Sequence, residues 1–160
     1  MAMRKFSRPG LFLVLLLVAA IVLWAAFFIY RTPSGASSKG KFGDVSLTLE
    51  YATTTAEQEL GLGGRTSLPS DYGMLFVFPD DERWGFWMKD TLVPLDMFWL
   101  DDQGQVIWME QGVATDTYPA VLYPPEPARY VLETAAGFAM AHDIATGTPL
   151  IISKWPNAAP

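Results

Sequence analysis

The sequence contains no cysteine, and His142 is its one histidine. The absence of cysteine excludes disulfides, zinc–thiolate centres, thiol catalysis and lipidation of an N-terminal cysteine. It does not decide the compartment, because an exported protein need not contain disulfides. With one histidine and no GxSxG motif, the sequence also disfavours a Ser-His-Asp hydrolase.

Basic residues are scarce outside the N-terminus. Four of the 11 lysines and arginines precede residue 32, whereas no acidic residue precedes Asp44. Residues 32–160 therefore carry the other 7 basic side chains and all 17 acidic ones, a formal net charge of −10. A domain this acidic repels phosphate backbones, so we expect it not to bind nucleic acid.

One long apolar run follows the short basic tail at residues 1–10. Leu11–Tyr30 is 20 residues long and has no charged side chain. About 20 helical residues at about 1.5 Å each cross the hydrocarbon core of a bilayer. We therefore predict a transmembrane anchor in the lipid bilayer at Leu11–Tyr30, in the inner membrane, with the remaining chain extracytoplasmic, in the periplasm. A cleaved signal peptide ending near Ser34–Ala36 is the alternative.

The rest of the chain has the length of one domain. Residues 31–43 are rich in Gly, Ser and Pro, which is typical of a flexible linker. We predict a single globular domain at residues 44–155 and a short tail at 156–160.

Short β-strands dominate the predicted secondary structure of that domain. Alternating apolar residues predict a half-buried strand at 45–51, and unbroken apolar runs predict buried strands at 74–78 and 95–100. Similar signals, some weaker, predict strands at 106–110, 130–133 and 149–153 and an extended segment at 84–91. Thr54 and Glu57 have the spacing of a capping box, which predicts a helix over 54–62. A second short helix is expected at 135–141. This pattern indicates a mainly β fold, an antiparallel sandwich or barrel with one or two short helices.

The densest apolar stretch, Phe86–Trp99, contains four aromatic residues and two methionines. Its polar side chains are Lys89, Asp90, Thr91 and Asp96. Charged groups within such a segment destabilise a fold unless they are paired. This cluster is therefore either a structural polar network or a functional site.

Several sequence blocks resemble, in order, those of the domain of unknown function 192 family. They are Gly61-Leu62 with Arg65, Gly73–Phe78, Phe86–Thr91, Pro94–Met97 and Ala128–Glu133 with Gly137. The resemblance covers about residues 44–153. It implies a small, mainly β domain of a type often exported or membrane-anchored in bacteria and archaea, with no established reaction. Two positions depart from the family pattern: Gly63-Gly64 replace a pair that includes a bulky residue, and Asp90 replaces an asparagine.

The blocks direct attention to one set of candidate site residues: Arg65, Trp87, Lys89, Asp90, Thr91, Asp96 and Glu133. Aromatic faces beside acidic, basic and hydroxyl groups suit a sugar or another small molecule. The first hypothesis is thus an envelope protein that binds a small molecule or glycan.

Two alternatives remain open for the same residues. A hydrolase would use Asp90, Asp96 and Glu133, because neighbouring carboxyls in an apolar pocket acquire different pKa values. In a purely structural network, Asp96 would instead pair with Arg65 or Arg129.

A soft-metal site is a weaker hypothesis. Thioethers bind Cu(I), and the chain offers several with one imidazole: Met74, Met88, Met97, Met109, Met140 and His142. Methionine at strand spacing more often fills a core, so we predict no metal and no cofactor.

Overall fold

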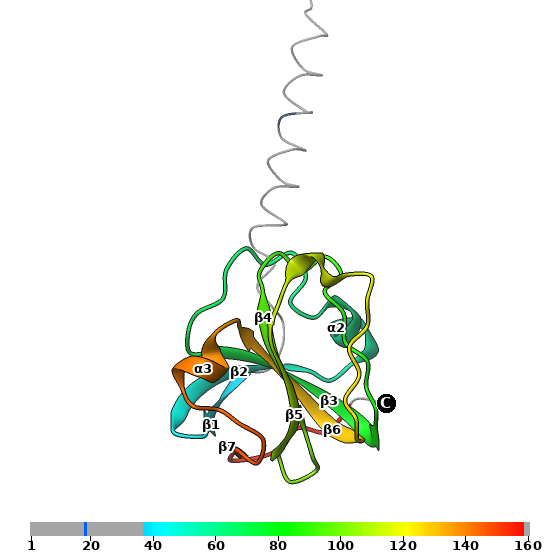
Figure 1. Ribbon diagram of the computed structural model, residues 1–160. Helices are drawn as coiled ribbons and strands as arrows, with labels where there is room; N and C mark the ends of the chain where they lie inside the picture. The colour runs from blue at the N-terminus through cyan, green and yellow to red at the C-terminus, as the bar shows by residue number, and fades with distance from the viewer. Residues whose placement is uncertain (1–17, 19–36, 159–160) are drawn as a thin grey trace, which may run out of the picture. The chain divides into compact units, whose positions relative to one another are not determined.

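Figure 1 shows a computed structural model of the chain, which describes Val18 and residues 37–158. The predicted basic tail at 1–10 and the predicted anchor at Leu11–Tyr30, apart from Val18, lie outside the described residues. No helix within the described part of the chain is long and apolar enough to cross a bilayer.

The described residues form one seven-stranded sheet in the order β5-β4-β6-β3-β2-β1-β7. β2 and β3 pair in parallel, and every other pairing is antiparallel. The strands are β1 Ser37–Phe42, β2 Val45–Ala52, β3 Tyr72–Glu82, β4 Leu95–Leu100, β5 Val106–Val113, β6 Ala128–Ala135 and β7 Leu150–Ile152. Three short helices accompany them: α2 Thr55–Leu60, the 3-10 helix η1 Thr115–Thr117 and α3 Phe138–Ala141.

The prediction of a mainly β fold with short helices is confirmed. The strands belong to one sheet, however, and not to the two sheets of a sandwich. The sheet curls so that its two edge strands approach each other at one end, where Gln105 and Pro149 form an isolated bridge. The amide of Val106 donates to the carbonyl of Thr148 at 3.1 Å beside this bridge.

Two local predictions differ from the structure. β1 begins at Ser37, within the range predicted as a linker, because residues 37–42 pair with both β2 and β7. Residues 84–91, predicted to be extended, form a loop with a single bridge between Phe86 and Leu122. Aromatic packing and side-chain hydrogen bonds hold this loop, and the apolar composition that resembled a strand serves those contacts.

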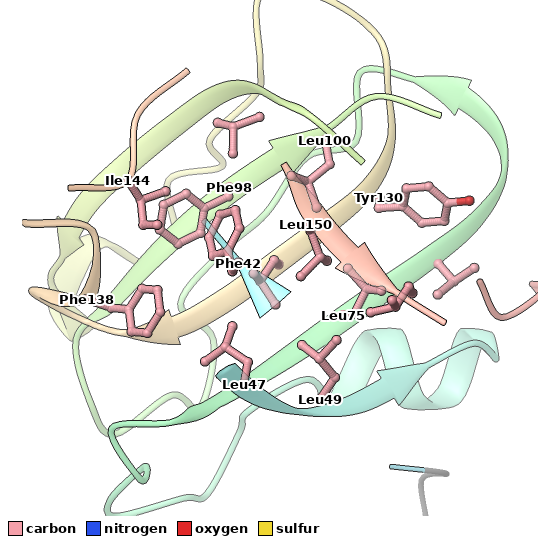
Figure 2. Close-up of a cluster of buried hydrophobic side chains, with 14 of the residues drawn as sticks. Phe42, Leu47, Leu49, Leu75, Phe98, Leu100, Tyr130, Phe138, Ile144 and Leu150 are labelled. Carbon is pink, nitrogen blue, oxygen red and sulfur yellow. The ribbon is translucent and has the colours of Figure 1, made fainter. Parts of the chain in front are cut away.

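The two faces of the sheet carry separate apolar clusters. Figure 2 shows the first core cluster, in which Phe42, Phe98 and Phe138 pack with leucines from several strands. Phe42 meets Phe98 edge-on at 5.0 Å between ring centroids and stacks on Phe138 at 6.2 Å. α3 covers this face, and α2 lies on the opposite side of the strands (Figure 1).

The second core cluster lies on the α2 side. Its buried members include Leu62, Met74, Phe76, Phe86, Met88, Met97 and Trp99. Both faces of the central strands are therefore covered, which explains why all six residues of β4 are buried.

Candidate functional site

The second core cluster borders a cavity of about 150 Å³. Its walls come from α2, the loop that follows α2, β3, β6 and the loop at residues 84–91. Buried lining residues include Leu62, Phe76, Phe78, Phe86, Thr91 and Glu133. Exposed lining residues at the mouth include Glu59, Leu60, Trp87 and Lys89.

α2 forms one wall, and its start is set by the predicted capping box. The Thr54 hydroxyl accepts a hydrogen bond from the Glu57 amide at 3.2 Å, and the Glu57 carboxylate accepts one from the Thr54 amide at 3.0 Å. Hydrogen bonds from the backbone amides of Thr54 and Thr53 are the main cause of the lowered pKa of Glu57. The side-chain amide of Gln58 donates a hydrogen bond to the backbone carbonyl of Val77 at 2.8 Å, which fixes the helix against β3.

The loop at residues 84–91 forms the opposite wall. The indole of Trp84 stacks on the Phe78 ring at 4.0 Å between centroids. The backbone carbonyl of Trp84 accepts a hydrogen bond from the Trp99 indole N–H at 2.9 Å. Phe86 meets Phe76 edge-on at 4.8 Å. These contacts make the aromatic wall rigid, so the cavity is preformed by packing.

Glu133 is the most deeply buried polar residue that lines the cavity. Its side chain is 3% exposed, and none of the described residues donates a hydrogen bond to its carboxyl. Every fully buried side-chain nitrogen and oxygen in the described part of the chain has a partner. The unpartnered Glu133 oxygens must therefore face the open space of the cavity. Burial raises the pKa of Glu133 to about 8, and the Arg65 guanidinium acts in the opposite direction.

Arg65 belongs to a different polar network. Its guanidinium donates to both Glu50 carboxylate oxygens, at 2.9 and 3.0 Å, and to the Tyr72 hydroxyl at 2.7 Å. The Tyr72 hydroxyl in turn donates to Glu50 at 2.6 Å. Burial is the main cause of the raised pKa of Tyr72, and the hydrogen bond to Glu50 adds to it. Arg65 is thus committed to Glu50, and it influences Glu133 only through its charge.

Asp96 is buried on the other face of the sheet. One carboxylate oxygen accepts from the Gly112 amide at 2.7 Å, and the other accepts from the Ala139 amide at 2.8 Å. Gly112 has a φ of 61° and lies at a bulge of β5, and Ala139 is in the first turn of α3. The prediction that Asp96 pairs with Arg65 or Arg129 is therefore wrong: Arg129 pairs with Asp81, and backbone amides satisfy Asp96.

Asp90 has a backbone role in the structure. Its φ is 56°, and the Thr91 amide closes the turn by donating to the Met88 carbonyl at 3.2 Å. The Asp90 carbonyl accepts a hydrogen bond from the Gly64 amide at 2.8 Å. Asparagine and aspartate both tolerate this left-handed conformation, which accounts for an aspartate where the family pattern has asparagine. The Asp90 side chain is exposed and does not line the cavity.

The seven candidate residues thus separate into two groups. Trp87, Lys89, Thr91 and Glu133 all line the cavity, although Glu133 lies more than 40 positions from the others in sequence. Arg65, Asp90 and Asp96 do not line it.

Sequence analysis missed four polar residues: Gln58 and Glu59, which line the cavity, and Glu50 and Tyr72, which form the network with Arg65. The alternation in β2 places Glu50 on the face expected to be exposed, but it is 8% exposed because both faces of the sheet are covered. No local signal identifies it. Alternating apolar and polar residues usually indicate a strand with one face in solvent.

The methionines do not gather with the histidine. Met74, Met88 and Met97 are buried in the second core cluster, whereas Met140 is 79% exposed on α3. His142 packs against Phe138 at 4.6 Å between ring centroids, next to the first core cluster. Within the residues that the structure describes, no three His, Asp or Glu side chains are grouped so as to hold a metal ion.

The chain is thus a small β-rich domain with a curled sheet and a cavity on the α2 side of that sheet. Residues 37–152 match the model of the DUF192 family, described as "Uncharacterized ACR, COG1430". The chain belongs to this family, as the sequence blocks had indicated.

Two crystal structures resemble the chain. One is a putative transcription regulator from Sinorhizobium meliloti 1021, with 28% identity and a TM-score of 0.69, covering 74% of this chain and 95% of that one. The other is a protein of unknown function from Novosphingobium aromaticivorans DSM 12444, with 25% identity and a TM-score of 0.70, covering 79% of this chain and 90% of that one. No curated protein matches the chain.

Proposed function

We propose that the domain binds a small molecule, or the terminal ring of a glycan, in the cavity beneath α2. The observation that carries this proposal is the Glu133 carboxyl, which is buried, has no protein partner and faces the cavity. The oxygens of this carboxyl are open to hydrogen bonds from a molecule inside the cavity. Its presence at the end of an aromatic cavity is explained if a ligand supplies the missing hydrogen bonds.

The size of the cavity limits the ligand. A cavity of about 150 Å³ accommodates roughly one benzene ring. The cavity therefore accepts one ring or a chain of similar volume, with the remaining part of a larger ligand outside the mouth. Trp87, which is 44% exposed, offers an aromatic face there, and Lys89 and Thr91 offer hydrogen-bonding groups.

The predicted anchor would place this binding domain at the cell envelope. In this proposal Leu11–Tyr30 crosses the inner membrane, and the sheet lies in the periplasm, where glycans and other small envelope molecules are available. A proteinase accessibility assay on spheroplasts and intact cells tests the placement. Protection of the domain in spheroplasts would contradict it.

The geometry does not favour the hydrolase alternative. Asp96 pairs in register with Thr134, the neighbour of Glu133, so Asp96 and Glu133 point to opposite faces of the sheet. Both Asp96 oxygens already accept backbone hydrogen bonds. Asp90 lies in an exposed turn outside the cavity.

Thermal unfolding of the full-length protein in detergent micelles tests ligand binding. The panel holds monosaccharides, peptidoglycan fragments and other one-ring molecules. A ligand at 100 times its Kd adds about 2.7 kcal/mol to the free energy of unfolding, which raises Tm by several degrees. The shift should disappear in Trp87→Ala and Glu133→Gln.

The matched control is Trp108→Ala. Trp108 is 38% exposed, close to the 44% of Trp87, but it does not line the cavity. Trp108→Ala should keep the ligand-dependent shift. A shift that survives in Glu133→Gln, or the absence of any shift across the panel, would overturn the proposal.

A further inference from the structure

We infer that the cavity selects a ligand with a small cationic group, a primary ammonium, which pairs with the Glu133 carboxylate at the buried end. The inference rests on the proposed function, because it assigns a chemical class to the ligand of the same site. It goes further by stating which charge the ligand carries and which end of it enters the cavity.

Within the described residues, Glu133 has no cationic side chain as an ion-pair partner. An ionised carboxylate only accepts hydrogen bonds, and a buried one requires a positive or hydrogen-bonding partner. Arg65 is near enough to affect Glu133 by its charge, yet its guanidinium is bound to Glu50 and Tyr72. An ammonium group supplies three donors and one positive charge, which is the complement of what Glu133 lacks.

Aromatic side chains form much of the cavity walls. Phe76, Phe78, Phe86, Trp84 and Trp87 all line the cavity. The faces of aromatic rings carry partial negative charge and attract cations within about 6 Å of a ring centroid. An aromatic cavity that ends in a carboxyl therefore attracts a cation from its walls and from its buried end.

The domain that holds the cavity is acidic. Residues 32–160 carry a net charge of −10, which favours the approach of cations over anions. At the mouth, Lys89 is exposed and Glu59 lies on α2, so the two charges there have opposite sign. Their exposure to solvent screens both charges, whereas Glu133 acts from within the protein.

Binding of an ammonium group is then coupled to proton release. With its pKa raised to about 8, Glu133 holds a proton in most molecules at pH 7 and must lose it to form the ion pair. Arg65, from the loop after α2, is the charged group that acts on Glu133. Lys89 and Glu59 line the same cavity, and Glu50 of β2 is bound to Arg65. Of these, Arg65 favours the ionised form of Glu133.

Calorimetric titration of the full-length protein in detergent micelles tests the inference with shape-matched probes. The pairs are cyclohexylamine with cyclohexanol, and glucosamine with glucose. We expect the amine of at least one pair to bind at least tenfold more tightly than its neutral counterpart. Titration of cyclohexylamine, which is fully protonated at pH 7, in two buffers of different ionisation enthalpy should show release of close to one proton on binding.

Two variants locate the effect. Glu133→Gln keeps the shape of the side chain and should lose at least tenfold in amine affinity, while its Tm shows that it folds. Lys154→Gln is the control: Lys154 is exposed and does not line the cavity, so removing its charge should leave cyclohexylamine affinity within about twofold of the parent. A tenfold loss of cyclohexylamine binding in Lys154→Gln would show that overall charge sets the affinity and would overturn the inference.

The failure of the inference is distinguishable from the failure of the proposed function. If the neutral probes bind as tightly as the amines and Glu133→Gln abolishes both, the cavity is a binding site but not for cations. If neither probe class nor the wider panel binds, both proposals fail. Amine binding that persists in Glu133→Gln also overturns the inference.

Discussion

Each face of the sheet holds one carboxyl that is 3% exposed or less, and the two carboxyls have opposite surroundings. Asp96, at 0% exposure, has a backbone amide on each oxygen. Glu133, at 3% exposure, has no protein donor and faces a cavity. β4 and β6, which carry them, are adjacent strands. A satisfied buried acid indicates architecture, and an unsatisfied one beside a cavity indicates a site.

The largest predicted effect is the loss of stability when Asp96, the carboxyl with two backbone donors, is replaced. Asp96→Ala leaves the Gly112 and Ala139 amides without acceptors at a bulge and at the start of α3. We expect a loss of about 3–5 kcal/mol in the free energy of unfolding, as for removal of a buried charged partner. Urea denaturation followed by circular dichroism measures it. Asp96→Asn, which retains one acceptor, should lose less, and a loss below about 1 kcal/mol in Asp96→Ala would refute the structural role.

The next largest effect is the pH dependence of stability that comes from Glu133, on the α2 side of the sheet. The pKa of Glu133 is raised in the folded state to about 8 from an ordinary value of 4.5. The unfolded chain therefore releases this proton first, and stability falls as pH rises from about 4.5 to about 8, then levels off. We expect Glu133 to contribute a fall of about 3 kcal/mol between pH 5 and pH 8.

Denaturation of Glu133→Gln across the same pH range isolates that contribution. The variant lacks the titrating group, so the difference in stability between it and the parent should grow in favour of the variant as pH rises. Parallel pH profiles in the two proteins would show that Glu133 does not titrate as its environment indicates.

A smaller effect is expected on replacing Arg65, which binds Glu50 and acts on Glu133 through its charge. Arg65→Met removes the donor that Glu50 shares with Tyr72 and should destabilise the fold by about 2 kcal/mol, less than a fully buried pair because Arg65 is 23% exposed. It should also raise the pKa of Glu133 further, since the Arg65 charge lowers it. Carboxyl carbon chemical shifts during an NMR titration report that pKa. Arg129→Met, which disrupts a more exposed pair with Asp81, is the control.

The smallest effect concerns the turn at Asp90, which the hydrogen bond from Thr91 to Met88 closes. Asp90→Ala places a residue without a local hydrogen-bonding side chain at a φ of 56°, so we expect a loss of about 1 kcal/mol. Asp90→Asn and Asp90→Gly should stay within about 0.5 kcal/mol of the parent. Chemical denaturation separates these values. If Asp90→Asn were instead to abolish ligand binding, the carboxylate would have a role beyond the turn.

Local sequence patterns predicted some elements of the fold and not others. Alternation and apolar runs predicted β2 and β4 to within a residue or two at each end, because those signals are local. The capping box of α2 was predicted for the same reason. The loop at 84–91 was predicted as extended because its aromatic density is also typical of strands, and only its contacts with Phe78 and Trp99 distinguish it.

The sequence by itself determined the acidic charge, the absence of cysteine, the family, the β-rich class and a short set of polar residues within an apolar stretch. The tertiary structure decided which of them meet. The register that pairs Met97 with Glu133 and Asp96 with Thr134 places the two acids on opposite faces. Because side chains alternate along a strand, a shift of one residue would exchange those faces. That register depends on strands more than 30 positions apart, and no local pattern encodes it.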